Sequence, residues 1–279
     1  MSLPSAPSAQ SSPAAPAVPA FDLTGRLALV TGSGRGIGRA IARGYALAGA
    51  RVVLNGRDAA RLEATAAELR AEIVSRDPRR SPDDVRLSAF DVTDATAAER
   101  ACEAIVAAHG CPDILVNNAG IQIRGALTEI SFDDWKRVLD ANLTGGFIVG
   151  RAVARHMLPR GSGKIINVCS VQSQIVRATT GPYAAAKTGF GGLTRAMCAE
   201  WAPSGIQVNG LAPGYIETDL NASLVADPDF TRWITQRTPA RRWGRVEDVV
   251  GPAIWLASAA ADFVNGQVIY IDGGMTAVI

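Results

Sequence analysis

LALVTGSGRGIG, residues 27–38, joins a short apolar run to a turn that contains four glycines. The apolar run indicates a buried strand, and the pattern over residues 36–48 indicates a helix. Glycines at such a junction permit a positive φ and a close approach of the backbone, while the free N–H groups at the helix start attract a phosphate. The spacing Gly-x-x-x-Gly-x-Gly, between the first strand and the first helix, predicts a dinucleotide-binding turn rather than a merely structural one.

The alternation of strand and helix continues along the chain. Further strands are expected at residues 51–55, 85–90, 113–117, 164–169, 206–211 and 267–271, and further helices at 59–74, 94–109, 132–157, 183–201 and 246–258. Strands that are apolar throughout and separated by helices form a parallel sheet covered on both faces. We therefore predict an α/β fold with a doubly wound, Rossmann-type sheet of seven parallel strands, in a single domain over residues 21–279.

Composition bounds the class of protein. The net charge is only +2 and the basic residues are spread along the chain, so no nucleic-acid partner is expected. Four cysteines without paired spacing and two histidines predict no metal site and a reducing, cytoplasmic location. Residues 1–20, rich in Ser, Ala and Pro, predict a disordered tail rather than a targeting segment, and no later stretch suits a membrane span.

The end of the second strand bears on which dinucleotide binds. An acidic residue there would bind a ribose 2′-hydroxyl, whereas a basic residue accommodates a 2′-phosphate. This strand ends Leu54-Asn55-Gly56-Arg57, without a carboxylate, and Arg35 in the glycine turn can face the same phosphate. The sequence therefore predicts NADP(H) rather than NAD(H), with the alternative that both arginines only face water.

Tyr183 and Lys187 are four residues apart in an expected helix, and Ser170 precedes the tyrosine by thirteen residues. Positions i and i+4 share one face of a helix, so the ammonium can lie beside the phenol. A phenol has a pKa near 10, and a nearby cation stabilises its phenolate. The pair is a candidate proton-transfer unit, although a packed tyrosine and a solvated lysine would give the same spacing.

These motifs together resemble the short-chain dehydrogenase/reductase family over residues 21–279. The resemblance rests on the glycine turn, NNAG at residues 117–120, Asn142, Ser170, Tyr183 and Lys187, in that order. It implies that Tyr183 is the general acid and base and that Lys187 lowers its pKa and holds the nicotinamide ribose. It also implies that Ser170 orients the substrate oxygen and that Asn142 supports a proton-relay water.

The resemblance and the glycine turn also give a set of cofactor-binding residues. These are Gly32, Ser33, Arg35, Gly36, Ile37, Gly38, Arg57, Asp91, Val92, Asn117, Ala119, Gly120, Tyr183, Lys187, Pro213, Gly214, Ile216 and Thr218. The family further implies a lid segment, which we define as residues 218–240, and a homotetramer built through the helices that contain Asn142 and Tyr183.

Four segments resemble the gluconate 5-dehydrogenase branch of the family: NNAGIQIR (117–124), IINVCSVQS (165–173), IQVNGLAPGY (206–215) and RTPARRWG (237–244). This implies hydride transfer between NADP(H) and a secondary alcohol or ketone of a sugar acid such as gluconate or 5-ketogluconate. Arg124 and Arg177 would face the carboxylate, while Ser170 and Gln172 would bind oxygens of the substrate, with the alternative that the two arginines are only rim residues. Gln174 departs from the branch, which has a glutamate there.

Two other functions remain open from the sequence. A 3-oxoacyl carrier-protein reductase shares every catalytic residue and needs a basic surface, for which Arg241, Arg242 and Arg245 are candidates. A non-catalytic NADP(H)-sensing protein would bind the same cofactor, but a degraded catalytic set would be expected. The complete set of catalytic residues in this chain argues against that second alternative.

Overall fold

A seven-stranded sheet forms the centre of the computed structural model, which describes residues 21–279. The strands are Leu27–Val30 (β1), Arg51–Gly56 (β2), Val85–Ala89 (β3), Ile114–Asn117 (β4), Gly163–Val168 (β5), Ile206–Pro213 (β6) and Val268–Ile271 (β7). Their order is β3-β2-β1-β4-β5-β6-β7, and every neighbouring pair is parallel. The predicted doubly wound fold is confirmed, while the predicted tail lies outside the described residues.

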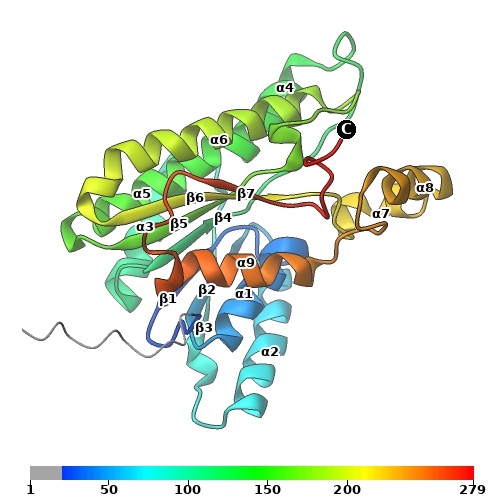
Figure 1. Cartoon of the computed structure of the whole chain (residues 1–279). Helices are drawn as coiled ribbons and strands as arrows, with labels where there is room; N and C mark the ends of the chain where they lie inside the picture. The colour runs from blue at the N-terminus through cyan, green and yellow to red at the C-terminus, as the bar shows by residue number, and fades with distance from the viewer. Residues whose placement is uncertain (1–20) are drawn as a thin grey trace, which may run out of the picture.

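Helices cover both faces of the sheet (Figure 1). They are Gly36–Leu47 (α1), Ala59–Arg76 (α2), Ala95–His109 (α3), Phe132–Leu139 (α4), Gly145–Arg160 (α5), Gly181–Trp201 (α6), Ala222–Val225 (α7), Pro228–Arg237 (α8) and Val246–Ala257 (α9). One apolar core contains buried residues of α1, α2 and α9, and a second contains buried residues of α3, α5 and α6. Within the described part of the chain, no helix is long and apolar enough to cross a membrane.

The helix expected over residues 132–157 is not continuous. One turn of π-helix, Asp140–Thr144, separates α4 from α5, and Asn142 lies within it. Single π-turns inside helices are frequent at functional sites. The apolar pattern predicts the helix but cannot show the extra residue in this turn, because the pattern is similar on both sides of it.

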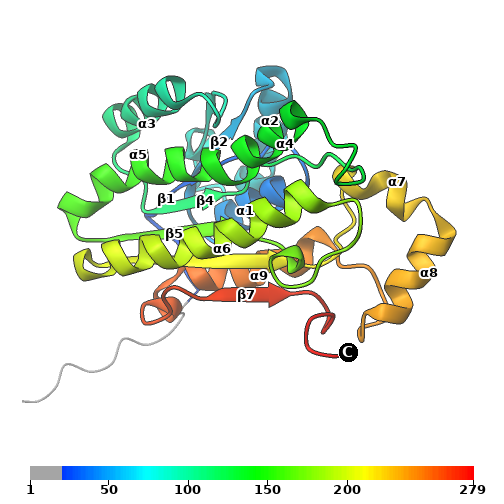
Figure 2. The ribbon, with the colours of Figure 1, turned by 90° about the horizontal axis from the view of Figure 1, so that it is seen from above.

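The lid segment consists largely of short helices. Asp219–Asn221 forms a 3₁₀ turn that leads into α7, and α8 follows after a short loop. Figure 2 shows α7 and α8 beyond the carboxyl ends of the strands, at the edge of the sheet where a doubly wound fold binds its ligands.

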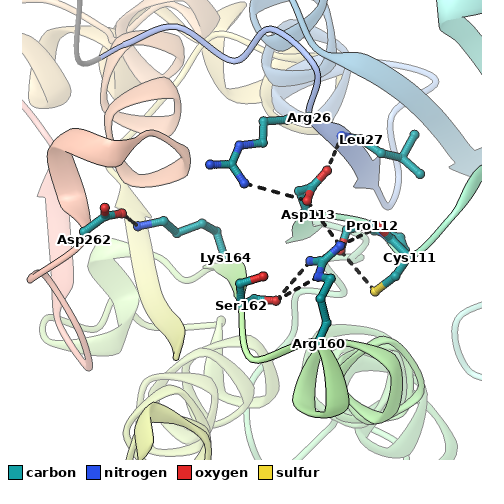
Figure 3. Close-up of polar contacts among 9 residues, drawn as sticks. All are labelled: Arg26, Leu27, Cys111, Pro112, Asp113, Arg160, Ser162, Lys164 and Asp262. Atoms are coloured by element: carbon teal, nitrogen blue, oxygen red, sulfur yellow. Dashed lines mark hydrogen bonds and ion pairs between the residues drawn. The ribbon is translucent and has the colours of Figure 1, made fainter. Parts of the chain in front are cut away.

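At the opposite edge of the sheet, Asp113 joins the amino ends of three strands (Figure 3). Its carboxylate accepts the Leu27 N–H at 2.8 Å and pairs with Arg160 at 3.2 Å and Arg26 at 3.7 Å. Arg160 also donates to the Ser162 carbonyl, which precedes β5. One partly buried carboxylate therefore ties β1, β4 and β5 together.

Replacing Asp113 with alanine should lower the free energy of unfolding by about 2 kcal/mol, because the Leu27 N–H and the Arg160 guanidinium lose their shared acceptor. Urea denaturation measures the loss. The matched control is Asp83→Ala, which removes an exposed pair with Arg86 and should cost under about 1 kcal/mol. Equal losses in the two variants would contradict the role given to Asp113.

Candidate active site

A cleft of about 490 Å³ follows the carboxyl ends of the central strands. It includes the point between β1 and β4 where the strand order reverses, the usual ligand site of a doubly wound sheet. Gly32 and Gly36 in its wall have φ of +63° and +55°, as the glycine turn predicted. The turn thus exposes backbone N–H groups at the start of α1 toward a cleft of ligand size.

Most of the expected cofactor residues line this cleft. They are Gly32, Arg35, Gly36, Ile37, Arg57, Asp91, Val92, Ala119, Gly120, Tyr183, Lys187, Pro213, Gly214, Ile216 and Thr218. The four expected catalytic residues, Asn142, Ser170, Tyr183 and Lys187, line it as well. The fold therefore brings one set of residues, from the ends of six strands, two α-helices and the π-turn, into a single groove.

Ser33, Gly38 and Asn117 were expected to contact the cofactor but lie behind the cleft wall. The Ser33 hydroxyl is buried and accepts the Asn55 N–H at 2.9 Å, which ties the turn to β2. Asn117 donates from its amide to Asn167 Oδ1 at 2.9 Å, between β4 and β5. Gly38 packs against the turn itself, so all three shape the groove rather than line it.

Gly38 leaves no room for a side chain. A Cβ there would lie 2.4 Å from Asn118 Nδ2 and 2.5 Å from the Gly32 carbonyl oxygen. Asn118 cannot move freely, because its amide donates to the Thr31 and Gly32 carbonyls at 2.9 and 3.1 Å. Asn118 belongs to the NNAG motif but was not among the expected site residues, yet its side chain fixes the glycine turn.

Tyr183 and Lys187 lie on the same face of α6, with Nζ 5.6 Å from the centroid of the phenol ring. Lys187 is only 3% exposed, and its ammonium donates to the Val168 carbonyl at 2.6 Å. Ser170 follows β5 and accepts the Gln172 N–H on its hydroxyl at 3.1 Å. That contact uses an acceptor lone pair of Ser170 and leaves its O–H free to donate.

Burial shifts the pKa values of both Tyr183 and Lys187. Burial raises the pKa of Tyr183 to about 12, although the neighbouring Ser170 hydroxyl acts in the opposite direction. Burial also lowers the pKa of Lys187 to about 8, because its ammonium is removed from water. The Lys187 ammonium bonds to the Val168 carbonyl, and its role in lowering the pKa of Tyr183 stays a prediction.

Asn142 is held rigidly by the π-turn. Its amide nitrogen donates to the Ile121 and Val138 carbonyls at 2.8 and 2.9 Å. Its Oδ1 is buried and accepts no hydrogen bond from residues 21–279. A buried acceptor of this kind normally receives a donor, such as an ordered water or a ligand group.

Three of the expected substrate residues lie beside the cleft rather than in its wall. Arg124 donates to Asn221 at 3.5 Å, and the positive charge of Arg177, together with burial, lowers the pKa of Arg124. Among residues 21–279, neither Gln172 Oε1 nor Arg177 Nε has a hydrogen-bond partner, although both atoms are buried. The same holds for Nε2 of Gln122, which the sequence analysis did not identify.

Two further residues of the site were missed. Arg61 lines the cleft from the first turn of α2, one helical turn after Arg57. Tyr215 lies close enough to Arg124 and Arg177 for both charges to lower its pKa, although burial raises it overall. The spacing from Arg57 could have indicated Arg61, whereas no local pattern marks Tyr215.

Known proteins match this chain over most of its length. The family model described as Enoyl-(Acyl carrier protein) reductase matches residues 32–276. The chain is 48% identical to gluconate 5-dehydrogenase of Gluconobacter oxydans, over 92% of this chain and 96% of that protein. It is 42% identical to 5-keto-D-gluconate 5-reductase of Escherichia coli, over 93% of this chain and 98% of that protein.

A solved structure agrees with these matches. Gluconate 5-dehydrogenase from Burkholderia cenocepacia, in complex with NADP and tartrate, superposes with a TM-score of 0.86 at 51% identity, over 93% of this chain and 98% of that one. Fold and site together define an oxidoreductase of the Rossmann type. More particularly, the chain belongs to the short-chain dehydrogenase/reductase family.

Gly38→Ala should lower the free energy of unfolding by about 2 kcal/mol, because the new methyl group overlaps Asn118 and the Gly32 backbone. Gly34→Ala is the matched control in the same turn. Its Cβ would lie 3.4 Å from the flexible Arg61 stem and 3.7 Å from Leu62 Cδ2, both ordinary contacts, so a change below about 0.5 kcal/mol is expected. Denaturant unfolding compares the two, and a stable Gly38→Ala variant would refute the packing argument.

Proposed function

We propose that this protein transfers a hydride between NADP(H) and a secondary alcohol or ketone of a sugar acid, as in the gluconate and 5-ketogluconate pair. The observation that carries the proposal is a pair of neighbouring cations, Arg124 and Arg177, of which Arg124 also lies close to the catalytic tyrosine. Two neighbouring cations favour an anion between them, and arginine suits a carboxylate. The activities in the names of the two relatives support this assignment.

The cleft fits NADP(H). Arg35, Arg57 and Arg61 lie at the end of the cleft formed by the glycine turn, β2 and α2, and Arg57 is 72% exposed. β2 itself ends in Asn55 and Gly56, without the carboxylate of an NAD-binding site, and Asp58 two residues further on caps α2 by accepting the Arg61 N–H at 3.0 Å. These arginines would hold the 2′-phosphate, and the solved relative that contains NADP supports the choice over NAD(H).

The residues around Tyr183 suit the reduction of a carbonyl. The nicotinamide supplies the hydride chemistry when it is bound. Tyr183, protonated at neutral pH, donates its proton to the carbonyl oxygen, and the free O–H of Ser170 donates a hydrogen bond to the same oxygen. Lys187 uses one of its three N–H donors on Val168 and keeps two for the nicotinamide ribose. Asn142 Oδ1 accepts from the relay water.

Lys187 should make the reaction sensitive to alkaline pH. A lysine with a pKa of about 8 is charged below that pH and neutral above it, so its contribution is lost as the pH rises. We expect kcat/KM for NADPH, which reports the free enzyme, to be level from about pH 6 to 7 and to fall above about pH 8. Lys187→Arg should be slower but lose that fall. A profile that stays level to about pH 10 in the unaltered enzyme would contradict the assignment.

The carrier-protein alternative receives less support from the surface arginines. Arg242 pairs with Asp248 at 2.6 Å, and Arg241 donates to the Gln236 carbonyl at 3.0 Å. The Arg245 N–H caps the start of α9 through Asp248. The charge of Arg242 is therefore paired and the Arg241 guanidinium has a backbone partner, which weakens the case for an open basic patch that binds an acidic carrier.

The assay that tests the proposal follows NADPH oxidation with 5-ketogluconate and with an acetoacetyl thioester, and repeats the first with NADH. We expect 5-ketogluconate to have the larger kcat/KM and NADPH the lower KM. Faster reduction of the thioester would establish the reductase alternative, and a preference for NADH would overturn the cofactor. Tight NADPH binding without turnover of any carbonyl would favour a sensing protein.

The proposal also covers the cellular compartment, the oligomeric state and the lid of the enzyme. All four cysteines are free, which supports a reducing cytoplasm. Phe132 on α4 and Phe147 on α5 are 77% and 41% exposed, which supports a homotetramer assembled through these helices and α6. Residues 218–240 would act as the lid over the substrate. A monomer mass in light scattering would contradict the tetramer.

A further inference from the structure

Both arginines proposed for the substrate carboxylate contact the lid segment. Arg124 Nη2 donates to Asn221 Oδ1 at 3.5 Å, and Asn221 ends the 3₁₀ turn before α7. Arg177 places its guanidinium carbon 5.1 Å from the centroid of the Phe230 ring, in the first turn of α8. The contact between Arg177 and Phe230 has the geometry of a cation–π interaction, because a guanidinium within about 6 Å of a ring is attracted by the π-electrons of that ring.

Phe230 is fixed by an aromatic cluster of four rings. Its centroid lies 5.3 Å from Trp233, 5.8 Å from Tyr215 and 6.1 Å from Trp243. Trp243 is 6% exposed and donates from its indole to Thr231 at 3.2 Å. Since Tyr215 follows β6 and Trp243 precedes α9, the cluster holds the first turn of α8 against the body of the domain.

The Arg177 guanidinium packs against the Phe230 ring, and its Nε–H has no hydrogen-bond partner among residues 21–279. The guanidinium carbon of Arg177 lies over the Phe230 ring, and Arg177 is close enough to Tyr215 for its charge to act on the pKa of that phenol, which burial raises overall. Nε is buried, and no residue from 21 to 279 accepts its hydrogen bond. A cation held over a ring keeps its N–H groups in the guanidinium plane, where a carboxylate binds in bidentate fashion.

We propose that Phe230 is a positioning residue for substrate binding, whose ring holds the Arg177 guanidinium beside the cleft, where it would bind the substrate carboxylate. The inference rests on the proposed function, because it requires an anionic substrate. Phe230 does not line the cleft that contains Tyr183 and the cofactor residues. Its loss should therefore raise KM for the sugar acid and leave kcat nearly unchanged.

A double-mutant cycle between Phe230 and Arg177 tests the proposal. Phe230→Leu should raise KM for 5-ketogluconate about tenfold in the unaltered background, because the cation–π contact is lost. Phe230→Tyr keeps an aromatic face and should stay within about threefold. In an Arg177→Met background, Phe230→Leu should change KM less than about twofold, since the side chain it positions is gone. Circular dichroism and NADPH binding check that each variant is folded.

Two outcomes would overturn the inference. One is an equal increase in KM in both backgrounds, which would show that Phe230 acts through lid packing and not through Arg177. The other is a fall in kcat for Phe230→Leu without a change in KM. Failure of the proposed function itself is recognised separately, because the unaltered enzyme would then not reduce 5-ketogluconate with NADPH at all.

Discussion

The hydrogen bonds between the glycine turn and the end of β4 are the constraint on which the site depends. The Thr31 hydroxyl accepts the N–H groups of Asn118 and Ala119 at 2.9 and 3.1 Å, and the Asn118 amide donates back to the Thr31 and Gly32 carbonyls. These contacts join the loop after β1 to the loop after β4 at the point where the strand order reverses. Without them the start of α1 could not lie this near to Gly120 and the catalytic half of the groove.

A second buried polar chain fixes α6 to the sheet. Asn117 donates to Asn167 at 2.9 Å, and Asn167 donates to the Thr194 hydroxyl at 3.0 Å, with all three side chains at most 3% exposed. Lys187 adds its bond to the Val168 carbonyl. A buried network is costly to break, so α6 cannot slide along β5. This explains how Ser170, on a strand end, and Tyr183, on a helix, keep one relative position.

The sequence predicted best the features that repeated local patterns determine. Periodicity indicated the seven strands and the face shared by Tyr183 and Lys187, and ordered motifs indicated the Asn142 and Ser170 positions. It could not predict properties that depend on burial by distant residues. The pKa of Lys187 is one example, because it is set by the removal of the ammonium from water. The aromatic partners of Arg177 are another, since they come from separate elements.

The raised pKa of Tyr183 bears on how one site serves both reaction directions. A protonated phenol is ready to act as the acid in carbonyl reduction, and burial in the protein favours that form. Alcohol oxidation needs the phenolate instead, and an oxidised nicotinamide carries the positive charge that would stabilise it. The protonation state of the tyrosine is then matched to the redox state of the cofactor. The two arginines proposed for the substrate, Arg124 and Arg177, contact the lid segment, and the charge of Arg124 also acts to lower the pKa of Tyr183.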